Sequence, residues 1–235
     1  MASRSNALLE RFLTALISGD RPAAREIVAE TFASGCSAEE VVAHLIWPTA
    51  EKVQTMHRSD QMGELAYHFA TRTLRSLADQ IGGKLSRRPS REQTALVVCG
   101  EEECEELAGQ LAADLLEADG YRVYFAGGGV ANDEIVAQLG EIDAHKLVVF
   151  GAVPSTAPQT RLLIDRLHEL GACPDLQIIV GGGVFNRAEG LAEEIGADLW
   201  ARTPSELVAT MDAQPERRMA SDQRTVGRRR RVAAA

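Results

Sequence analysis

The sequence lacks a long apolar run and has few positive charges relative to negative ones. Each of these features argues against a class of protein. No stretch approaches the roughly 18 apolar residues that a membrane-spanning helix needs. The N-terminus also lacks the apolar core of a signal peptide, so we expect a cytoplasmic protein without a membrane partner. The 25 basic residues face 34 acidic ones and leave a net charge of -9. This balance disfavours a domain that binds nucleic acid, because binding needs clustered Lys and Arg to neutralise the phosphates.

Cysteines are few and widely spaced. The four of them form no C-x-x-C pair and show no zinc spacing, which indicates free thiols in a reducing compartment. Cys104 is surrounded by glutamates between residues 101 and 106. Anionic neighbours raise the pKa of a thiol, so hydrolytic cysteine chemistry is disfavoured. Glutamates at the front of a helix also suit its dipole.

Basic residues gather only near the C-terminus. Residues 214–235 have no apolar periodicity and contain the run Arg228–Arg231. We predict a solvated, disordered tail here, with contact to a partner or to nucleic acid through these arginines as the alternative.

The first 81 residues carry a helical pattern. Apolar residues recur at 3-4 spacing in four segments that end near Ser18, Gly35, His57 and Gln80. Pro48 lies inside the third segment and should bend or divide it. Four helices joined by short turns predict a bundle over residues 1–81. Residues 82–93 are polar and aperiodic, which is typical of a linker.

From residue 94 to 213, short apolar runs alternate with helical ones. Strands are predicted at 95–99, 122–125, 146–150, 177–180 and 198–200, and helices at 103–119, 132–140, 157–170, 187–195 and 203–212. This alternation predicts parallel βαβ units with right-handed crossovers. The fold class is therefore α/β: an N-terminal four-helix bundle followed by a flavodoxin-like, doubly wound, five-stranded parallel sheet in the order 2-1-3-4-5.

Three glycines, Gly181, Gly182 and Gly183, follow the fourth predicted strand. They stand at a carboxyl end, where sheets of this kind bind ligands, and they let a ligand approach the backbone without a Cβ. An ordinary tight turn is the alternative. Asn186 and Glu189 have the spacing of an N-cap and its N3 partner, so a helix should begin at Asn186.

The order of bundle and sheet resembles the cobalamin-binding modules of methionine synthase, corrinoid methyl carriers and B12-dependent photoreceptor regulators. The likeness covers about residues 37–212. Gly127 resembles the glycine after the family's second strand, and Gly151 to Ser155 stand where the family has Ser-x-Leu and a further hydroxyl. The pair Gly181-Gly182 matches the glycines that admit the nucleotide tail of cobalamin. Pro48 and the pair Tyr67-His68 fall where the family has a helix proline and Glu-His.

The resemblance implies a cobalamin or related tetrapyrrole between bundle and sheet, with haem as an alternative. It places ten residues at that ligand: His57, Tyr67, His68, Gly127, Ala152, Val153, Ser155, Gly181, Gly182 and Gly183. His57 and His68 are also candidate upper axial metal ligands, because neutral imidazole binds cobalt and haem iron well. A structural role is the alternative for each.

The departures from the family lie in the pocket. Members that bind cobalamin through a protein imidazole carry Asp-x-His-x-x-Gly after the first strand, and here Glu105 replaces the histidine and Ala108 the glycine. Cobalt corrinoids favour imidazole nitrogen over a hard carboxylate, so histidine ligation from this loop is excluded. Gly151 stands where the family has the first serine of Ser-x-Leu, and His57 stands where the family has a tryptophan in the bundle. This pattern fits three alternatives. The protein binds a different ligand, it binds cobalamin with its own base still attached, or it has lost the ligand.

Two other functions of this sheet are excluded. A receiver domain needs an aspartate at the end of the third strand, where Phe150 and Gly151 stand, and a dinucleotide site needs a Gly-x-Gly-x-x-Gly that Cys99 to Cys104 lacks. Our first hypothesis is a non-catalytic, cobalamin-binding-like sensor or regulatory module that signals through a protein partner. The second is a corrinoid methyl carrier of a methyltransferase system, and the third is a ligand-free adaptor.

Overall fold

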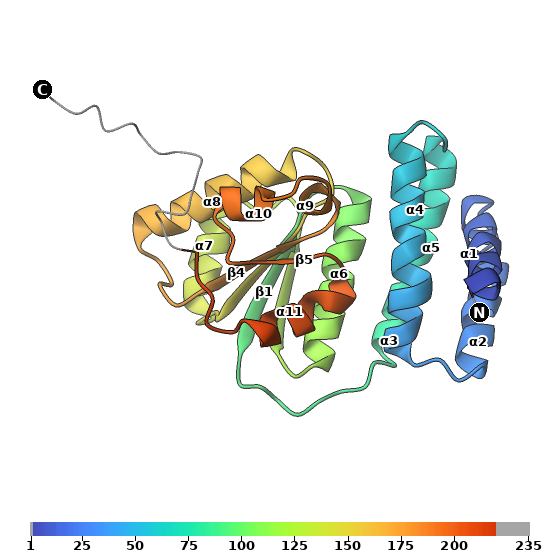
Figure 1. Cartoon of the computed structure of the whole chain (residues 1–235), viewed down its shortest axis with the longest axis horizontal. Coiled ribbons are helices and arrows are strands. Elements are labelled where there is room, and N and C mark those ends of the chain that lie inside the picture. The colour runs from blue at the N-terminus through green and yellow to red at the C-terminus, as the bar shows by residue number, and fades with distance from the viewer. Residues whose placement is uncertain (1, 220–235) are drawn as a thin grey trace, which may run out of the picture.

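The computed structural model describes residues 2–219, and the predicted Arg228–Arg231 contact lies outside them. A helical bundle stands beside an α/β domain (Figure 1). The bundle consists of α1 (Ala2–Ile17), α2 (Arg21–Ala33), α3 (Ala38–Val41), the π-helical turn η1 (Val42–Ile46), α4 (Trp47–Arg58) and α5 (Glu64–Gly82). The α/β domain consists of β1 (Thr94–Cys99), α6 (Glu103–Ala118), β2 (Arg122–Gly127), α7 (Asn132–Glu141), β3 (Lys146–Phe150), α8 (Thr156–Leu170), β4 (Gln177–Gly181), α9 (Gly183–Arg187), α10 (Leu191–Ile195), β5 (Leu199–Ala201), the 3₁₀ turn η2 (Pro204–Glu206) and α11 (Leu207–Ala213).

The sheet is parallel and runs in the order β2-β1-β3-β4-β5, as predicted. Its middle strands β3 and β4 are buried on both faces, which explains why they read as unbroken apolar runs. One face packs with α6 and α11, through residues such as Val97, Leu111 and Leu207. The other face packs with α7, α8 and α10.

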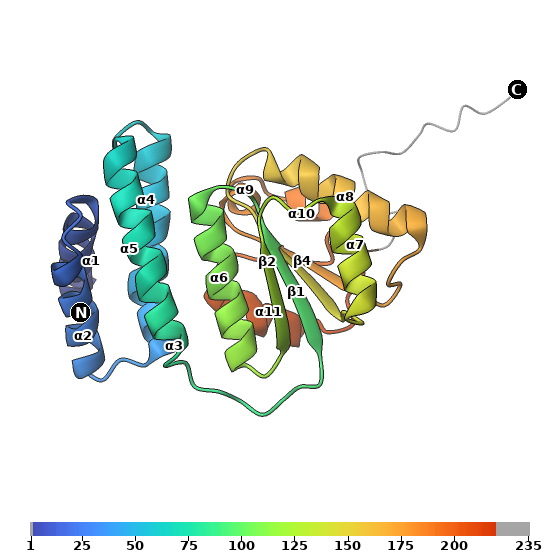
Figure 2. The same cartoon turned by 180° about the vertical axis from the view of Figure 1, so that it is seen from behind.

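The bundle joins the α/β domain mainly through α5, which packs along α6. Seen from behind, α6 stands between α5 and the sheet (Figure 2). A continuous apolar cluster contains Leu77 of α5, Leu111 of α6 and Phe150 of β3. The two domains therefore share one apolar core.

The chain does not break at Pro48. Helical structure continues from Ala38 to Arg58, and the π turn η1 lies directly before the proline. In that turn the Trp47 N–H donates to Val42 O, five residues back. A π turn changes the hydrogen-bond register locally, so the helix passes a residue that has no N–H to donate. Of the two predicted effects, division of the helix is therefore not seen, and a bend at Pro48 stays a prediction.

The helix predicted at 187–195 is two short helices, α9 and α10. The first begins after Gly182, whose φ of 97° forms the sharp turn out of β4. Asn186 is thus inside α9 rather than before it, and its side-chain amide donates to Arg202 O at 2.8 Å. The start of the predicted tail also has defined contacts, since Gln177 donates to Gln214 O and Arg217 O. Between residues 2 and 219, each helix is too short or too polar to cross a bilayer.

Candidate functional site

A small cavity lies where α4 meets the carboxyl edge of the sheet. Its volume is about 10 Å³. Its lining residues are Trp47, Ala50, Glu51, Gln54, Cys104, Ala108, Gly151, Ala152, Gly182 and Gly183. The first four recur at the spacing of one helix face, so α4 forms the roof. This stripe was not among the predicted site residues, although its 3-4 spacing is visible in the sequence.

The floor of this cavity is main chain that follows β3 and β4. A Cβ added to Gly182 would lie 2.5 Å from Gly151 O, and one added to Gly181 would lie 2.8 Å from Cζ of Phe150. The glycines are therefore needed for the close packing of the protein on itself. Of the predicted residues, Ala152, Gly182 and Gly183 line the cavity, whereas Gly181 is buried below it.

Glu105 occupies the space beneath this floor. Its side chain is fully buried. The carboxylate accepts hydrogen bonds from Ala152 N at 2.6 Å, Val153 N at 3.1 Å and Thr156 Oγ1 at 2.6 Å. A fourth, from Glu102 N at 3.2 Å, completes a capping box at the start of α6. A carboxylate satisfied in this way joins α6 to the loop after β3.

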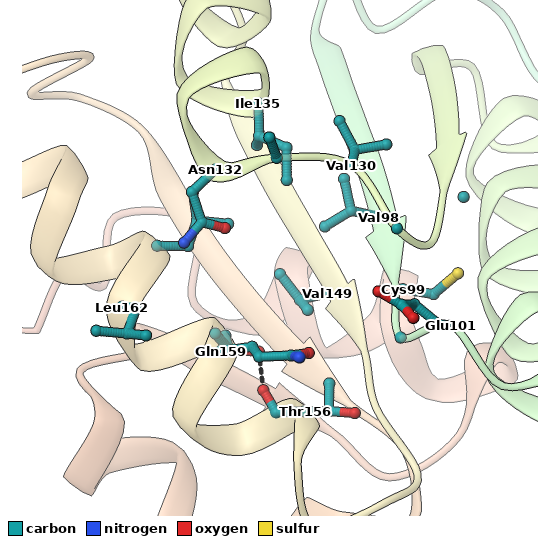
Figure 3. A pocket seen from close by; sticks show the side chains of 16 residues that line it. Val98, Cys99, Glu101, Val130, Asn132, Ile135, Val149, Thr156, Gln159 and Leu162 are labelled. Carbon is teal, nitrogen blue, oxygen red and sulfur yellow. Dashed lines mark hydrogen bonds between the residues drawn. The ribbon is translucent and has the colours of Figure 1, made fainter.

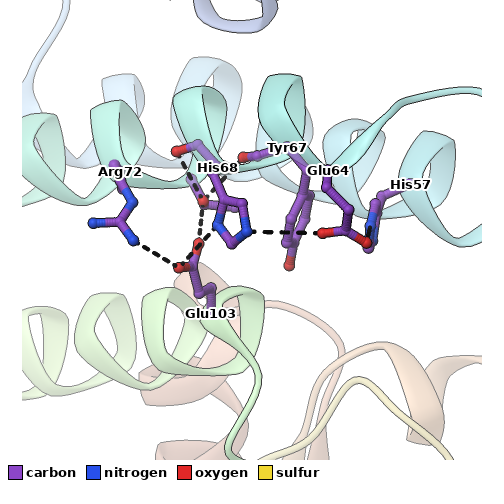
Figure 4. A network of polar contacts seen from close by, with 7 residues as sticks. His57, Glu64, Tyr67, His68, Arg72 and Glu103 are labelled. Atoms are coloured by element: carbon purple, nitrogen blue, oxygen red, sulfur yellow. Dashed lines mark hydrogen bonds and ion pairs between the residues drawn. The ribbon is translucent and has the colours of Figure 1, made fainter.

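The neighbouring Glu103 joins α6 to α5. Its carboxylate accepts from Thr71 Oγ1 and lies 3.3 Å from Nδ1 of His68 and 3.8 Å from the Arg72 guanidinium. Figure 4 shows that these side chains bridge the gap between the two helices. Partial burial by itself would raise the pKa of Glu103, but the hydrogen bond from Thr71 and the contacts with His68 and Arg72 hold it below its ordinary value. We call this group, Glu103 with Thr71, His68 and Arg72, the α5–α6 clasp.

His57 and Tyr67 lie beside the clasp, at the junction of α4 and α5. Their rings stack with centroids 4.0 Å apart, and Glu64 lies 3.0 Å from Nε2 of His57 and 3.7 Å from Nε2 of His68. Both imidazoles are thus paired with carboxylates, and neither lines the cavity under α4. Their role as axial ligands stays a prediction.

Tyr67 connects this group to the cavity through Cys104. The two side chains interact electrostatically. Burial raises the pKa of the Cys104 thiol to about 11, and burial together with the adjacent thiol raises the pKa of Tyr67. Both groups are protonated at neutral pH, so the cavity contains no thiolate nucleophile.

A second cavity, of about 330 Å³, lies at the same edge on the α7 and α8 side. The amides of Asn132 and Gln159 approach it from two helices, and Val98 and Val149 line it from the sheet (Figure 3). Gly127 lines this cavity and not the one under α4. Ser155 is exposed at the start of α8. The ten predicted residues are therefore divided among several places.

Two family models match the chain, and both describe a B12 binding domain. One matches residues 93–209 and the other residues 8–81, so the sheet and the bundle are each covered. The chain belongs to the B12-binding domain family. The ligand class of this family is cobalamin and related corrinoids, rather than haem.

The similar proteins are corrinoid proteins. A dimethylamine corrinoid protein of Methanosarcina acetivorans is 27% identical over 109 residues, which are 46% of this chain and 50% of the relative. A corrinoid protein of Desulfitobacterium hafniense is 27% identical over 119 residues, or 50% of this chain and 54% of the relative. The chain thus spans about half the length of the curated relatives it matches.

The fold is also that of a solved corrinoid protein. The structure of the monomethylamine corrinoid protein of Methanosarcina barkeri superposes with a TM-score of 0.75. The match covers 88% of this chain and 99% of that chain at 17% identity. At this identity the likeness shows the shared fold alone.

The residues around the first cavity fit a corrinoid in chemistry. The floor carries no side chain larger than a methyl group at Gly151, Ala152 and Gly182, so a broad ring could lie on it. In the roof, the buried Trp47 indole N–H has no acceptor among residues 2–219. Corrinoids carry amide oxygens that would accept from it. The space does not fit as it stands, because about 10 Å³ holds a single water. The place between bundle and sheet, where the resemblance implied a tetrapyrrole, is closed in this structure.

Proposed function

We propose that the protein binds a corrinoid between α4 and the carboxyl edge of the sheet and presents it to a partner protein, as the carrier component of a methyl-transfer system. The observation that carries this proposal is the floor of small residues and exposed main chain. It lies opposite the α4 residues Trp47, Ala50, Glu51 and Gln54. The family models, which match the bundle as well as the sheet, support it. The names of the curated relatives place them in the same class.

The chain itself would act by binding and orienting. Gly151, Ala152 and Gly182 would allow close approach, and Trp47 would donate a hydrogen bond to a ligand amide. The bound corrinoid would supply the cobalt that carries a methyl group. Around the cavity, Cys104 and Tyr67 keep their protons and form no activated nucleophile. The proposed role is therefore that of a carrier and not of a catalyst.

A sensor is the second candidate, and the closed cavity favours it. A corrinoid enters only if α4 moves away from the floor, because the present volume holds a single water. Occupancy would therefore change the position of the bundle, and a partner protein could bind one position better than the other.

The binding experiment uses the full-length protein with hydroxocobalamin, methylcobalamin and haem, followed by desalting and an absorbance spectrum. We expect either cobalamin to stay bound at about one equivalent and haem to be lost. Gln54→Trp should abolish retention, because it fills the mouth of the cavity, whereas Lys52→Trp on the exposed face of α4 should leave it unchanged. Loss of every ligand during desalting would contradict the proposal and support a ligand-free adaptor.

A second measurement separates carrier from sensor. Methylcobalamin-loaded protein is mixed with a corrinoid methyltransferase of the host, and the spectrum of the bound cobalt is followed. Loss of the methyl group supports the carrier. A change in molecular shape on binding, with the methyl group retained, supports the sensor.

A further inference from the structure

We propose that the cavity of about 330 Å³ between α7 and α8 binds a purine base of the adenine type, free or as its nucleoside, at a site separate from the corrinoid site. This inference goes beyond the proposed function and does not depend on corrinoid binding. Three features carry it: the place of the cavity at the edge of the sheet, the unpaired polar side chains that face it, and the lack of a cation among its described lining residues.

The cavity lies at the switch point of the sheet. In the order β2-β1-β3-β4-β5, the chain passes from β1 to β2 at one edge and then back to β3 on the other side of β1. Sheets of this order bind ligands in the crevice outside the carboxyl ends of the two strands where the order reverses. Val98 and Gly100 line the cavity from β1 and the turn after it, and Val149 lines it from β3. The fold therefore leaves room for a ligand at this position.

The walls suit a flat, apolar ring. The buried apolar side chains in the lining are Val98, Ile135, Val149 and Leu163. Beside them, the loops after β1 and β2 pack so closely that a Cβ added to Gly128 would lie 2.4 Å from Gly100 O. A volume of about 330 Å³ is at the lower end for small-molecule sites. The space therefore suits a base or a nucleoside and is too small for a whole corrinoid.

Two side-chain amides can recognise the base. Asn132 at the start of α7 and Gln159 in the first turn of α8 lie on opposite sides of the cavity (Figure 3). Neither amide makes a side-chain hydrogen bond within residues 2–219. Each offers one acceptor oxygen and two N–H donors, and this pattern pairs with the N6 and N7 atoms of adenine. Either amide can therefore pair with this edge of the base, and the other can donate to a remaining ring nitrogen.

The charge around the cavity favours a base or nucleoside over a nucleotide. The described lining residues include no Lys, Arg or His, and Glu101 is the only charged side chain among them. Arg166 of α8 is paired with Asp133 at 3.0 Å. A phosphate would therefore meet a carboxylate without a cation in the lining, whereas the hydroxyls of a ribose can donate to Glu101.

The cavity is closed off from the proposed corrinoid site. Thr156 lines this cavity, and Ala152 lines the one under α4. Both donate to the same Oε1 atom of Glu105, which is fully buried. Glu105 therefore lies between the two cavities, and one ligand would occupy both only if this buried group were broken.

The test is isothermal titration calorimetry of the full-length protein with adenine, adenosine and AMP, before and after loading with hydroxocobalamin. We expect adenine and adenosine to bind, and AMP to bind roughly tenfold more weakly or less, because its phosphate finds no cation. Loading with hydroxocobalamin should leave the adenosine affinity unchanged, since the two cavities are separate.

Variants locate the site. Asn132→Leu and Gln159→Leu should each weaken adenosine binding roughly tenfold, because each removes an amide that pairs with the base. Glu101→Ala should weaken the binding of adenosine but not of adenine. Gln138→Leu, on α7 but outside the cavity lining, is the matched control and should change neither. Circular dichroism of each variant checks that it is folded.

The inference is overturned if adenosine does not bind, or if it binds the Asn132 and Gln159 variants as tightly as the wild type. Equal affinity for AMP and adenosine would also contradict it. Loss of adenosine binding after hydroxocobalamin loading would show that the cavity belongs to the corrinoid site. Retention of hydroxocobalamin on desalting is measured separately, so the proposed function stands or falls independently of these results.

Discussion

At the scale of single residues, Glu105 is a buried carboxylate whose donors are all neutral. Three of them come from the loop and helix after β3, and the fourth from the start of α6. Hydrogen bonds to a charged acceptor contribute about 1.5–3 kcal/mol each. The side chain thus holds together the elements that form the floor of the site.

We expect Glu105→Ala to lower the free energy of unfolding by roughly 3–5 kcal/mol, because it leaves buried N–H and O–H donors without an acceptor. Urea unfolding followed by circular dichroism measures the change. Glu101→Ala, on an exposed neighbour, is the matched control and should change stability by less than about 0.5 kcal/mol. Equal stability of the two variants would show that the bonds of Glu105 contribute nothing.

Asp114 makes stability depend on pH. Burial, with Asp79 and Glu117 nearby, raises its pKa from 3.8 to about 6. The folded protein therefore binds this proton more tightly than the unfolded chain does. The stability that this group contributes is present below about pH 4 and is lost as the pH rises through 6.

We expect Asp114→Asn to raise the free energy of unfolding at pH 7.5 by on the order of 1–2 kcal/mol and to leave it unchanged at pH 4. Urea unfolding at the two pH values measures this difference. Asp175→Asn, in the exposed turn before β4, should have no such dependence on pH. A stabilisation of Asp114→Asn that is equal at both pH values would contradict the assigned proton.

At the scale of elements, the α5–α6 clasp joins the bundle to the sheet near the α4 cavity. Its members are partly exposed, with side-chain exposures of 44% for His68 and 31% for Glu103. Ion pairs of this kind contribute less than about 1 kcal/mol. The clasp therefore contributes little to the free energy of the closed arrangement, and breaking it would cost little.

We expect Glu103→Gln to speed amide hydrogen exchange in the first turns of α5 and α6 and to speed cobalamin uptake, with a stability loss below about 1 kcal/mol. Hydrogen exchange with mass spectrometry and stopped-flow absorbance measure the two effects. Glu30→Gln breaks a comparable exposed pair with Arg11 inside the bundle and should change neither. Unchanged uptake in Glu103→Gln would show that the clasp does not limit opening.

At the scale of the whole molecule, the bundle and the sheet share a core along α5 and α6 but meet only lightly at α4. The apolar cluster contains residues of α5 and α6 and also Trp47 and Ala50 of α4, and the cavity of about 10 Å³ lies under α4. Because the shared core is costly to open, movement of α4 and the top of α5 is the easier route to an open cleft.

We expect the radius of gyration from small-angle X-ray scattering to increase when hydroxocobalamin binds, because the roof must leave the floor to admit it. Gln54→Trp, in which the mouth is filled, should give the same scattering with and without cobalamin. An unchanged curve for a wild-type protein that retains cobalamin would place the ligand away from the α4 cavity.

The sequence by itself determined the class and order of the elements. Apolar runs at β3 and β4 predicted buried strands, and alternation with helices predicted the parallel sheet and its order. These are local periodicities, which a chain carries before it folds. The predicted division at Pro48 and the predicted helix start at Asn186 differ from the structure, and both lie where the backbone adopts a π turn or a positive φ that no periodicity reports.

Tertiary structure alone decided the site. The stripe from Trp47 to Gln54 and the glycines after β4 are far apart in sequence, and only the packing of α4 on the sheet brings them together. Three of the four partners of Glu105 are about 50 residues away along the chain. Whether a cavity is open depends on the volumes of side chains from several elements at once. Glycines and a family pattern predicted where a ligand could lie, and packing decided that the place is closed at rest.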